Sequence, residues 1–263
     1  MKVEHLRRLA PRFAVAPLLL VAGALALSGC KSGSIQNDPI LRLSSAEALE
    51  EGKRLYDAGK FSKARPYLSH AFEVEPNSAG GREALLLVAD CYFESESSSD
   101  LIQAEAKYRD FQNRFPTSPR ASYVQFQIAR SLSRRIERPE RDQEPTRKAR
   151  TALEDLLRLF PTSEYTGPAR EELTVVLDRL AEHEFLVGRF YLRYGIPAAA
   201  ATRLEEMLKE YPDYTHKDKA LFHLARAYES LDRSDDAQAT WSRLKTDYPE
   251  SAWTAKIPSE KAG

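Results

Sequence analysis

The chain has 263 residues, of which 30% are charged, and its 39 basic and 39 acidic side chains give a formal net charge of zero. This balance lacks the positive excess that marks a nucleic-acid-binding protein or a polybasic membrane-binding patch, so we expect no nucleic-acid partner. The length suits one elongated domain or two compact ones.

The first 30 residues have the three parts of a secretory signal. Four basic residues precede an apolar run from Ala14 to Leu27, which is too short and wrongly flanked for a membrane-spanning helix. Leu27-Ser28-Gly29-Cys30 then resembles a bacterial lipobox. The resemblance implies cleavage before Cys30, with diacylglycerol on its sulfur and an acyl chain on its new amine. The alternative is an ordinary signal peptide with a chance cysteine.

A short phrase, proline followed by any residue and then usually serine, punctuates the rest of the chain. It begins at Pro76, Pro116, Pro161, Pro212 and Pro249. Proline does not continue a helix, and serine can cap the next one. We therefore predict that Ser118 and Ser163 cap the helices that follow them. Ser44 and Glu47 have the spacing of a capping box at the first helix.

Between these phrases the segments resemble tetratricopeptide repeats, which are helix–turn–helix units of about 34 residues. In the first repeat, small Gly52 and Ala64 suit a close helix crossing, and Gly59 suits the turn between the helices. One such pair cannot bury its apolar face alone, so the pairs must stack. Nothing alternates with a period of two, so we predict no sheet.

The predicted fold is therefore all-α, a right-handed superhelical solenoid of about five tetratricopeptide repeats. We place the repeats at about 45–78, 79–118, 119–163, 164–214 and 215–251. The whole chain divides into a signal peptide at 1–29, a lipidated and flexible tether at 30–43, the solenoid at 44–255 and a frayed end at 256–263.

Three segments depart from a regular repeat. A polar insertion from Ser95 to Asp100 precedes a cap-like helix start, which we place at 100–103. A charged loop with two prolines runs from Ile136 to Pro145. One long helix is predicted from about Tyr165 to Tyr194, because the interval between Pro161 and Pro212 is longer than one helix pair needs.

The sequence contains no credible catalytic centre, and we predict that the protein is not an enzyme. Its histidines are scattered, with no spacing typical of a metal site. Glu182 and Glu184 are predicted to lie on a solvated helix face. Cys91 lies in an apolar helical stretch and is predicted to be buried and inert. We expect no metal and no cofactor other than the covalent lipid on Cys30.

The tripeptide Arg141-Asp142-Gln143 lies in the charged loop, just before a predicted helix. In a structural interpretation, Asp142 accepts hydrogen bonds from nearby helix N–H groups and Arg141 pairs with it. In a functional interpretation, the loop faces a partner. The residues alone leave both open.

Several stretches together resemble the BamD family, the lipoproteins of the outer-membrane β-barrel assembly machinery. The likeness covers about residues 40–251, with the lipobox at the expected place. The stretches that carry it are Arg141 to Ala149, Phe160 to Tyr165, His183-Glu184, Val187 to Tyr191 and Arg203 to Pro212.

The resemblance implies a site in each half of the solenoid. The C-terminal repeats would bind the last POTRA domain of BamA, the barrel-forming subunit, with Arg203, Glu206 and Tyr191 on that side. The N-terminal repeats would form a groove for unfolded outer-membrane β-barrel proteins. Its candidate wall residues are Tyr56, Tyr92 and Tyr108, although each could instead belong to the core.

The resemblance also implies a location and further partners. Lys31 follows the lipidated cysteine, where aspartate would retain a lipoprotein at the inner membrane. We therefore expect a lipid-anchored protein on the periplasmic face of the outer membrane, in contact with other lipoproteins of the assembly machinery. The alternative is an envelope adaptor of the Tol–Pal type, which coordinates peptidoglycan synthesis. That family carries an N-terminal coiled coil, for which residues 31–45 are too short.

Overall fold

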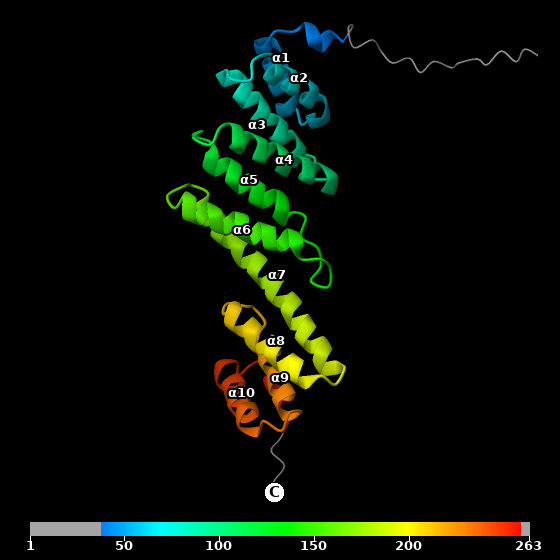
Figure 1. The fold of residues 1–263 in the computed structure, drawn as a ribbon, viewed down its shortest axis with the longest axis vertical. Coiled ribbons are helices and arrows are strands. Elements are labelled where there is room, and N and C mark those ends of the chain that lie inside the picture. The colour runs from blue at the N-terminus through cyan, green and yellow to red at the C-terminus, as the bar shows by residue number, and fades with distance from the viewer. Residues whose placement is uncertain (1–37, 259–263) are drawn as a thin grey trace, which may run out of the picture. The chain divides into compact units, whose positions relative to one another are not determined.

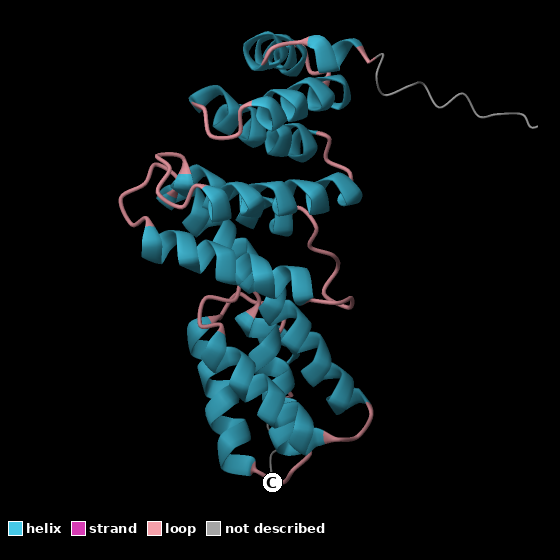
Figure 2. Cartoon of the chain, turned by 45° about the horizontal axis from the view of Figure 1, so that its top comes forward, coloured by secondary structure: helices cyan, strands magenta, loops and turns pink. Residues whose placement is uncertain are grey.

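The computed structural model describes residues 38–258, of which those from Pro39 onward belong to one compact unit. Within this range the chain is helical throughout, with no strand (Figure 2). The predicted signal peptide, the lipidated Cys30 and the last five residues lie outside the described part.

Between residues 38 and 258, ten α-helices follow one another as helix–turn–helix pairs. Their bounds are α1 (Ser45–Asp57), α2 (Phe61–Val74), α3 (Ala79–Glu94), α4 (Ser98–Arg114), α5 (Ala121–Ser133), α6 (Glu144–Leu159), α7 (Thr166–Arg193), α8 (Pro197–Glu210), α9 (Lys217–Glu229) and α10 (Ser234–Asp247). Each helix packs most extensively against its neighbours in sequence, and the first helices of adjacent pairs also meet, as α1 and α3 do. The pairs stack in chain order (Figure 1), which confirms the predicted tetratricopeptide-like solenoid.

Small residues let the helices of the first and fourth pairs approach closely. A Cβ atom on Gly52 would lie 2.6 Å from the side chain of Leu68, and one on Gly188 would lie 2.7 Å from Leu204. The turn after each first helix holds a glycine with positive φ, 69° at Gly59 and 72° at Gly195. Both helix pairs therefore share a glycine at the helix crossing and a glycine with positive φ in the turn.

Helix α7 has 28 residues, and its bounds confirm the prediction of one long helix from about 165 to 194. It packs against α6, α8 and α9. Figure 1 shows it running from beside α6 to the turn before α8. The C-terminal pairs are thus attached to the rest of the stack along a single continuous helix.

Of the three predicted helix caps, one is correct and two are wrong. Ser44 and Glu47 form the predicted capping box of α1. Ser118 and Ser163 do not cap helices: each hydroxyl accepts from the N–H two residues later, and α5 and α7 begin three residues after the serine. These serines stabilise a turn instead, because a side chain can satisfy a nearby N–H outside a helix.

The Ser-rich insertion is the start of α4. Helix α4 begins at Ser98, two residues before the predicted start, and Ser97 is its N-cap, accepting from the N–H of Asp100 at 3.1 Å. Glu96 takes a positive φ of 58° in the turn that leads to this cap.

Both ends of the described part are more ordered than predicted. The flexible tether was placed at 30–43, but Pro39–Arg42 forms a 3-10 helix, and the carbonyl of Leu43 lies 2.9 Å from Nε2 of His70. The frayed end was placed at 256–263, but Lys256 ends a second 3-10 helix and Ile257 packs against the last core cluster. Apolar Leu43 and Ile257 pack against core clusters, so the folded part extends past both of the predicted boundaries.

Candidate functional site

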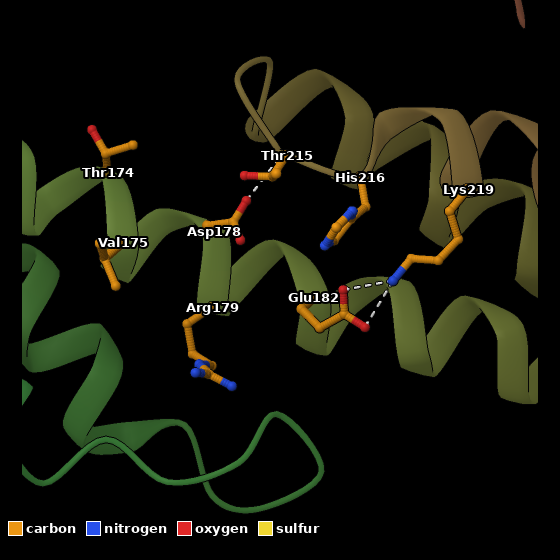
Figure 3. A pocket seen from close by; sticks show the side chains of 8 residues that line it. All are labelled: Thr174, Val175, Asp178, Arg179, Glu182, Thr215, His216 and Lys219. Carbon is orange, nitrogen blue, oxygen red and sulfur yellow. Dashed lines mark hydrogen bonds and ion pairs between the residues drawn. The ribbon is translucent and has the colours of Figure 1, made fainter. Parts of the chain in front are cut away.

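A short segment of α7 binds the elements around it through polar side chains. Oδ1 of Asp178 accepts from the backbone N–H of Thr215 at 2.8 Å. One turn later, Glu182 forms an ion pair with Lys219 at 2.8 Å and accepts a hydrogen bond from the hydroxyl of Tyr214. Figure 3 shows the contacts of Asp178 with Thr215 and of Glu182 with Lys219, beside a hollow of about 370 Å³ between α7 and the start of α9.

The next two residues of α7 connect it to the Arg-Asp-Gln loop and to α8. Nδ1 of His183 lies 2.6 Å from the carbonyl oxygen of Pro139, and because a carbonyl only accepts, this nitrogen carries the proton. Oε2 of Glu184 accepts from Nη1 of Arg203 at 2.9 Å. Glu182 and Glu184, predicted on a solvated helix face, are partly exposed, with 23% and 22% of their side chains accessible, and each also has a cationic partner.

The predicted partner-binding residues lie at this junction. The side chain of Arg203 is 42% exposed despite its contact with Glu184. Glu206 is exposed one turn later on the same side of α8. Tyr191, two turns beyond Glu184 on α7, is half-buried against the main core. The structure therefore leaves Arg203 and Glu206 accessible and gives Tyr191 a mainly structural position.

An exposed aromatic pair near the end of α7 was missed by the sequence analysis. Phe190 and Tyr194 are 50% and 60% exposed, and their ring centroids lie 4.4 Å apart. Ile196, in the turn that follows, is 48% exposed. Aromatic residues four apart at the end of a helix were the available signal, since such residues lie on one side of the helix.

The Arg-Asp-Gln loop matches half of its structural interpretation. Asp142 accepts from the N–H of Glu144 at 3.0 Å, as predicted. The predicted ion pair is absent, because Arg141 is exposed and has no acidic partner among the described residues. Gln143 holds the loop: it is buried, donates to the carbonyl oxygens of Arg138 and Arg141, and accepts from the hydroxyl of Thr146.

The three tyrosines predicted for the N-terminal groove differ in exposure. Tyr56 is half-buried, with its ring edge-to-face against Phe61 at 5.4 Å. Tyr92 is half-buried under the guanidinium of Arg65, 4.3 Å from its ring centre. Tyr108 is wholly buried, so its assignment to a groove wall is wrong. It is a core residue because α5 covers the face of α4 on which it lies.

Tyr108 belongs to a buried polar cluster. Its hydroxyl donates to Oδ1 of Asp90 at 2.6 Å, and the hydroxyl of Tyr123 donates to the same oxygen at 2.7 Å. The cluster links α3, α4 and α5. Burial raises the pKa of Asp90, and the two O–H donors act in the opposite direction.

The described residues show neither a metal site nor a membrane span. No group of histidine, cysteine and acidic side chains between residues 38 and 258 has an arrangement that would hold a metal ion. In the same range, no helix combines the length and the apolar character that crossing a bilayer requires. The predicted burial of Cys91 is confirmed, and burial raises the pKa of its thiol to about 12, which makes it unreactive.

Comparisons with known proteins give a consistent result. The family described as YfiO, outer membrane lipoprotein, matches residues 42–244. The chain is 31% identical over 238 residues to the outer membrane protein assembly factor BamD of Rickettsia prowazekii (strain Madrid E), with 89% of this chain and 91% of the relative covered. It is 25% identical over 244 residues to BamD of Caulobacter vibrioides, with 92% and 78% covered. Among solved structures, the TPR2AB-domain:pHSP90 complex of yeast Sti1 aligns with a TM-score of 0.43 at 16% identity over 80% of each chain.

Proposed function

The chain belongs to the YfiO family of outer membrane lipoproteins, and on that premise we propose that it is a non-enzymatic factor in outer membrane protein assembly. The observation that best supports this proposal is the length of the match to the family, which covers residues 42–244 and so nearly the whole solenoid. Relatives that align over most of both chains are outer membrane protein assembly factors. The lipid on Cys30 holds the protein on the periplasmic face of the outer membrane.

In this proposal the C-terminal half binds a POTRA domain of BamA through α8. Arg203 and Glu206 lie one turn apart on α8 and both reach solvent. Only Nη1 of Arg203 is used by Glu184, so its other guanidinium N–H groups remain free to donate to a partner. Tyr191 lies two turns along α7 from Glu184 and packs against the core, so its role at this surface is to hold α7 in place.

The N-terminal helix pairs receive unfolded outer-membrane β-barrel proteins. Tyr56 and Tyr92 keep part of their rings accessible, and Tyr108 does not. A stack of helix pairs offers an extended surface along which a peptide can lie. The other lipoproteins of the assembly machinery are further partners. The exposed aromatic pair of Phe190 and Tyr194 is the surface that we assign to them.

The test exchanges the charge at Arg203 in cells. Arg203→Glu is expected to reduce co-purification of BamA at least tenfold, because it places a carboxylate beside Glu184 and towards the partner. Arg243→Glu is the matched control: Arg243 is also exposed on a second helix of a pair and also has one acidic neighbour, Asp247. The circular dichroism and thermal unfolding of both variants should match those of the parent protein.

Each outcome has a separate meaning. Unchanged co-purification of BamA with Arg203→Glu would contradict the assignment of this surface. Recovery of Tol proteins without any component of the barrel assembly machinery would replace the proposed function with that of an envelope adaptor.

A further inference from the structure

Five polar or aromatic side chains follow one side of α5 and of the residues that flank it at each end. They are Arg120, Tyr123, Gln127, Arg130 and Arg134, whose spacing alternates between three and four residues. Residues so spaced lie along one side of an α-helix. We call this set the α5 stripe.

Hydrogen bonds hold the middle of the α5 stripe in place. The hydroxyl of Tyr123 donates to buried Asp90, and Nε2 of Gln127 donates to the same hydroxyl oxygen at 3.0 Å. Nη1 of Arg130 donates to Oε1 of Gln127 at 3.3 Å. The chain of contacts runs from the core to the surface, so Arg130 is positioned by a buried network and not by a neighbouring acid.

Two guanidinium groups of the α5 stripe form no ion pair among the described residues, although the charge of Arg120 acts on Asp90 and opposes the rise in pKa that burial causes in that carboxyl. The guanidinium of exposed Arg120 stacks 4.7 Å from the ring centre of Tyr123. The guanidinium of Arg130 lies 4.8 Å from the ring centre of Phe93. Arg134, at the far end, differs because it pairs with Glu96 at 3.0 Å. Stacking positions Arg120 and Arg130 and leaves N–H donors available, those of Arg130 other than the one given to Gln127.

A hollow of about 350 Å³ opens beside the first of these cations. Leu86, Leu87 and Phe111 give it apolar walls, and Arg82 and Arg120 also line it. Asp90 and Glu83 contribute carboxylates to the same hollow. An apolar side chain fits against the leucines and the phenylalanine, and a ligand N–H or O–H can donate to Asp90.

The separation of the two cations specifies the shape of a ligand. Arg120 and Arg130 are ten residues apart, which corresponds to about 15 Å along a helix. An extended chain rises about 3.3 Å per residue and therefore covers this distance in four to five residues. Because side chains alternate along an extended chain, residues four apart point to the same side.

We propose that the α5 stripe binds an extended acidic polypeptide segment. One carboxylate of the segment binds Arg120, with a neighbouring apolar side chain in the hollow of Leu86, Leu87 and Phe111. A second carboxylate, four residues later, binds Arg130. This inference rests on the proposed function and deepens it, because it gives the chemistry of the segments that the N-terminal helix pairs receive.

The test measures the binding of labelled synthetic peptides to the purified full-length mature protein by fluorescence anisotropy. The probe is an extended nine-residue peptide with two glutamates four residues apart and a leucine beside the first. It is expected to bind at least tenfold more tightly than the same peptide with glutamines, and more tightly than a peptide whose glutamates are two residues apart. Arg120→Gln and Arg130→Gln should each weaken binding about fivefold to tenfold.

Arg109→Gln is the matched control, since Arg109 is an exposed arginine on α4 whose acidic neighbour is Glu105. It should leave the affinity unchanged. Arg120→Glu should reject the probe and regain binding to a peptide with lysine at the first charged position. This rescue does not depend on whether Arg130→Gln remains folded.

Equal affinity for the glutamate and glutamine peptides, or an equal loss with Arg109→Gln, would overturn the proposal. These measurements contain no component of the barrel machinery. If Arg203→Glu releases BamA while the peptides fail to bind, the proposal for the α5 stripe falls and the proposed function stands.

Discussion

The α2–α3 and α6–α7 junctions start from the same Pro-x-Ser tripeptide and build different helix starts. Helix α3 begins directly after Ser78, whose hydroxyl accepts from the N–H of Gly81 at 2.9 Å and donates to the carbonyl of Glu75 at 3.0 Å. Helix α7 begins three residues after Ser163, whose hydroxyl accepts from the N–H of Tyr165. The residues after the serine decide whether it caps a helix or closes a turn.

The glycines near the two helix starts differ in the space around them. A Cβ atom on Gly81 would lie 1.9 Å from the backbone oxygen of Glu75, so α3 touches the preceding turn with its backbone. A Cβ atom on Gly167 would meet nothing within 4 Å. The first junction therefore requires a residue without a side chain, and the second does not.

The two regions also stabilise their buried faces differently. Asp90 on α3 is only 6% exposed and accepts from two tyrosine hydroxyls. Glu182 on α7 accepts from one tyrosine and pairs with Lys219, in a place that water reaches. Asp90 thus depends on enclosed contacts with little tolerance, while Glu182 depends on an ion pair near solvent.

Gly81→Ala is expected to have the largest effect on the free energy of unfolding. The new methyl group cannot be accommodated without moving the α2–α3 turn, because the atom it meets belongs to the backbone. We expect a loss of about 3 kcal/mol, at the upper end for an overpacked site. Urea unfolding, followed by circular dichroism, measures the change.

Gly167→Ala is the control for the same substitution in the first turn of α7. Its gain in helix propensity is offset by the restriction that Pro168 places on the preceding residue, so stability should change by no more than about 0.5 kcal/mol. If the two alanine variants unfold at the same urea concentration, the α2–α3 junction does not require glycine any more than the α6–α7 junction does.

Asp90→Ala should have the second largest effect, because it leaves two buried tyrosine hydroxyls without their acceptor. We expect a loss of about 2 to 3 kcal/mol. Glu182→Gln keeps an acceptor oxygen in a partly exposed pair and should cost about 1 kcal/mol or less. Equal losses in the two variants would show that the buried cluster around Asp90 and the partly exposed pair of Glu182 contribute equally to stability.

The pH dependence of unfolding sharpens this test at Asp90. Burial raises its pKa above the ordinary value of 3.8, so folding favours the protonated form. Its contribution is therefore fully present below pH 3.8 and is lost as the pH rises through the raised value. Asp90→Asn cannot ionise. Its stability relative to the parent protein should increase between pH 3.5 and pH 7, and a constant difference would contradict the raised pKa.

The helix pairs and the length of α7 could be predicted from the sequence because their causes are local. Small Gly52 and the turn glycine Gly59 act on residues close to them in the chain, and the apolar period of α7 continues without a break. Such patterns are visible without knowing which helices are neighbours.

The contacts of the candidate site depend instead on which helices meet. Nothing near Glu184 in sequence indicates Arg203, and nothing near His183 indicates the carbonyl of Pro139. Tyr92 and Tyr108 both lie on apolar helices, and only the position of α5 makes the second a core residue. Local patterns therefore located the loop, the family resemblance pointed to Arg203, and tertiary packing determined how they are connected.

Ser78→Ala is expected to have the smallest of these effects and compares the two serines directly. Ser78 is a helix N-cap, and losing its bond to the N–H of Gly81 should cost about 1 kcal/mol. Ser163→Ala removes only a turn contact at 3.2 Å, because the helix begins later, and should cost a few tenths of that. Thermal unfolding of both variants in the same buffer measures the difference. A greater loss at Ser163 would mean that the turn before α7 matters more to stability than the cap of α3, which would reverse the contrast between the junctions.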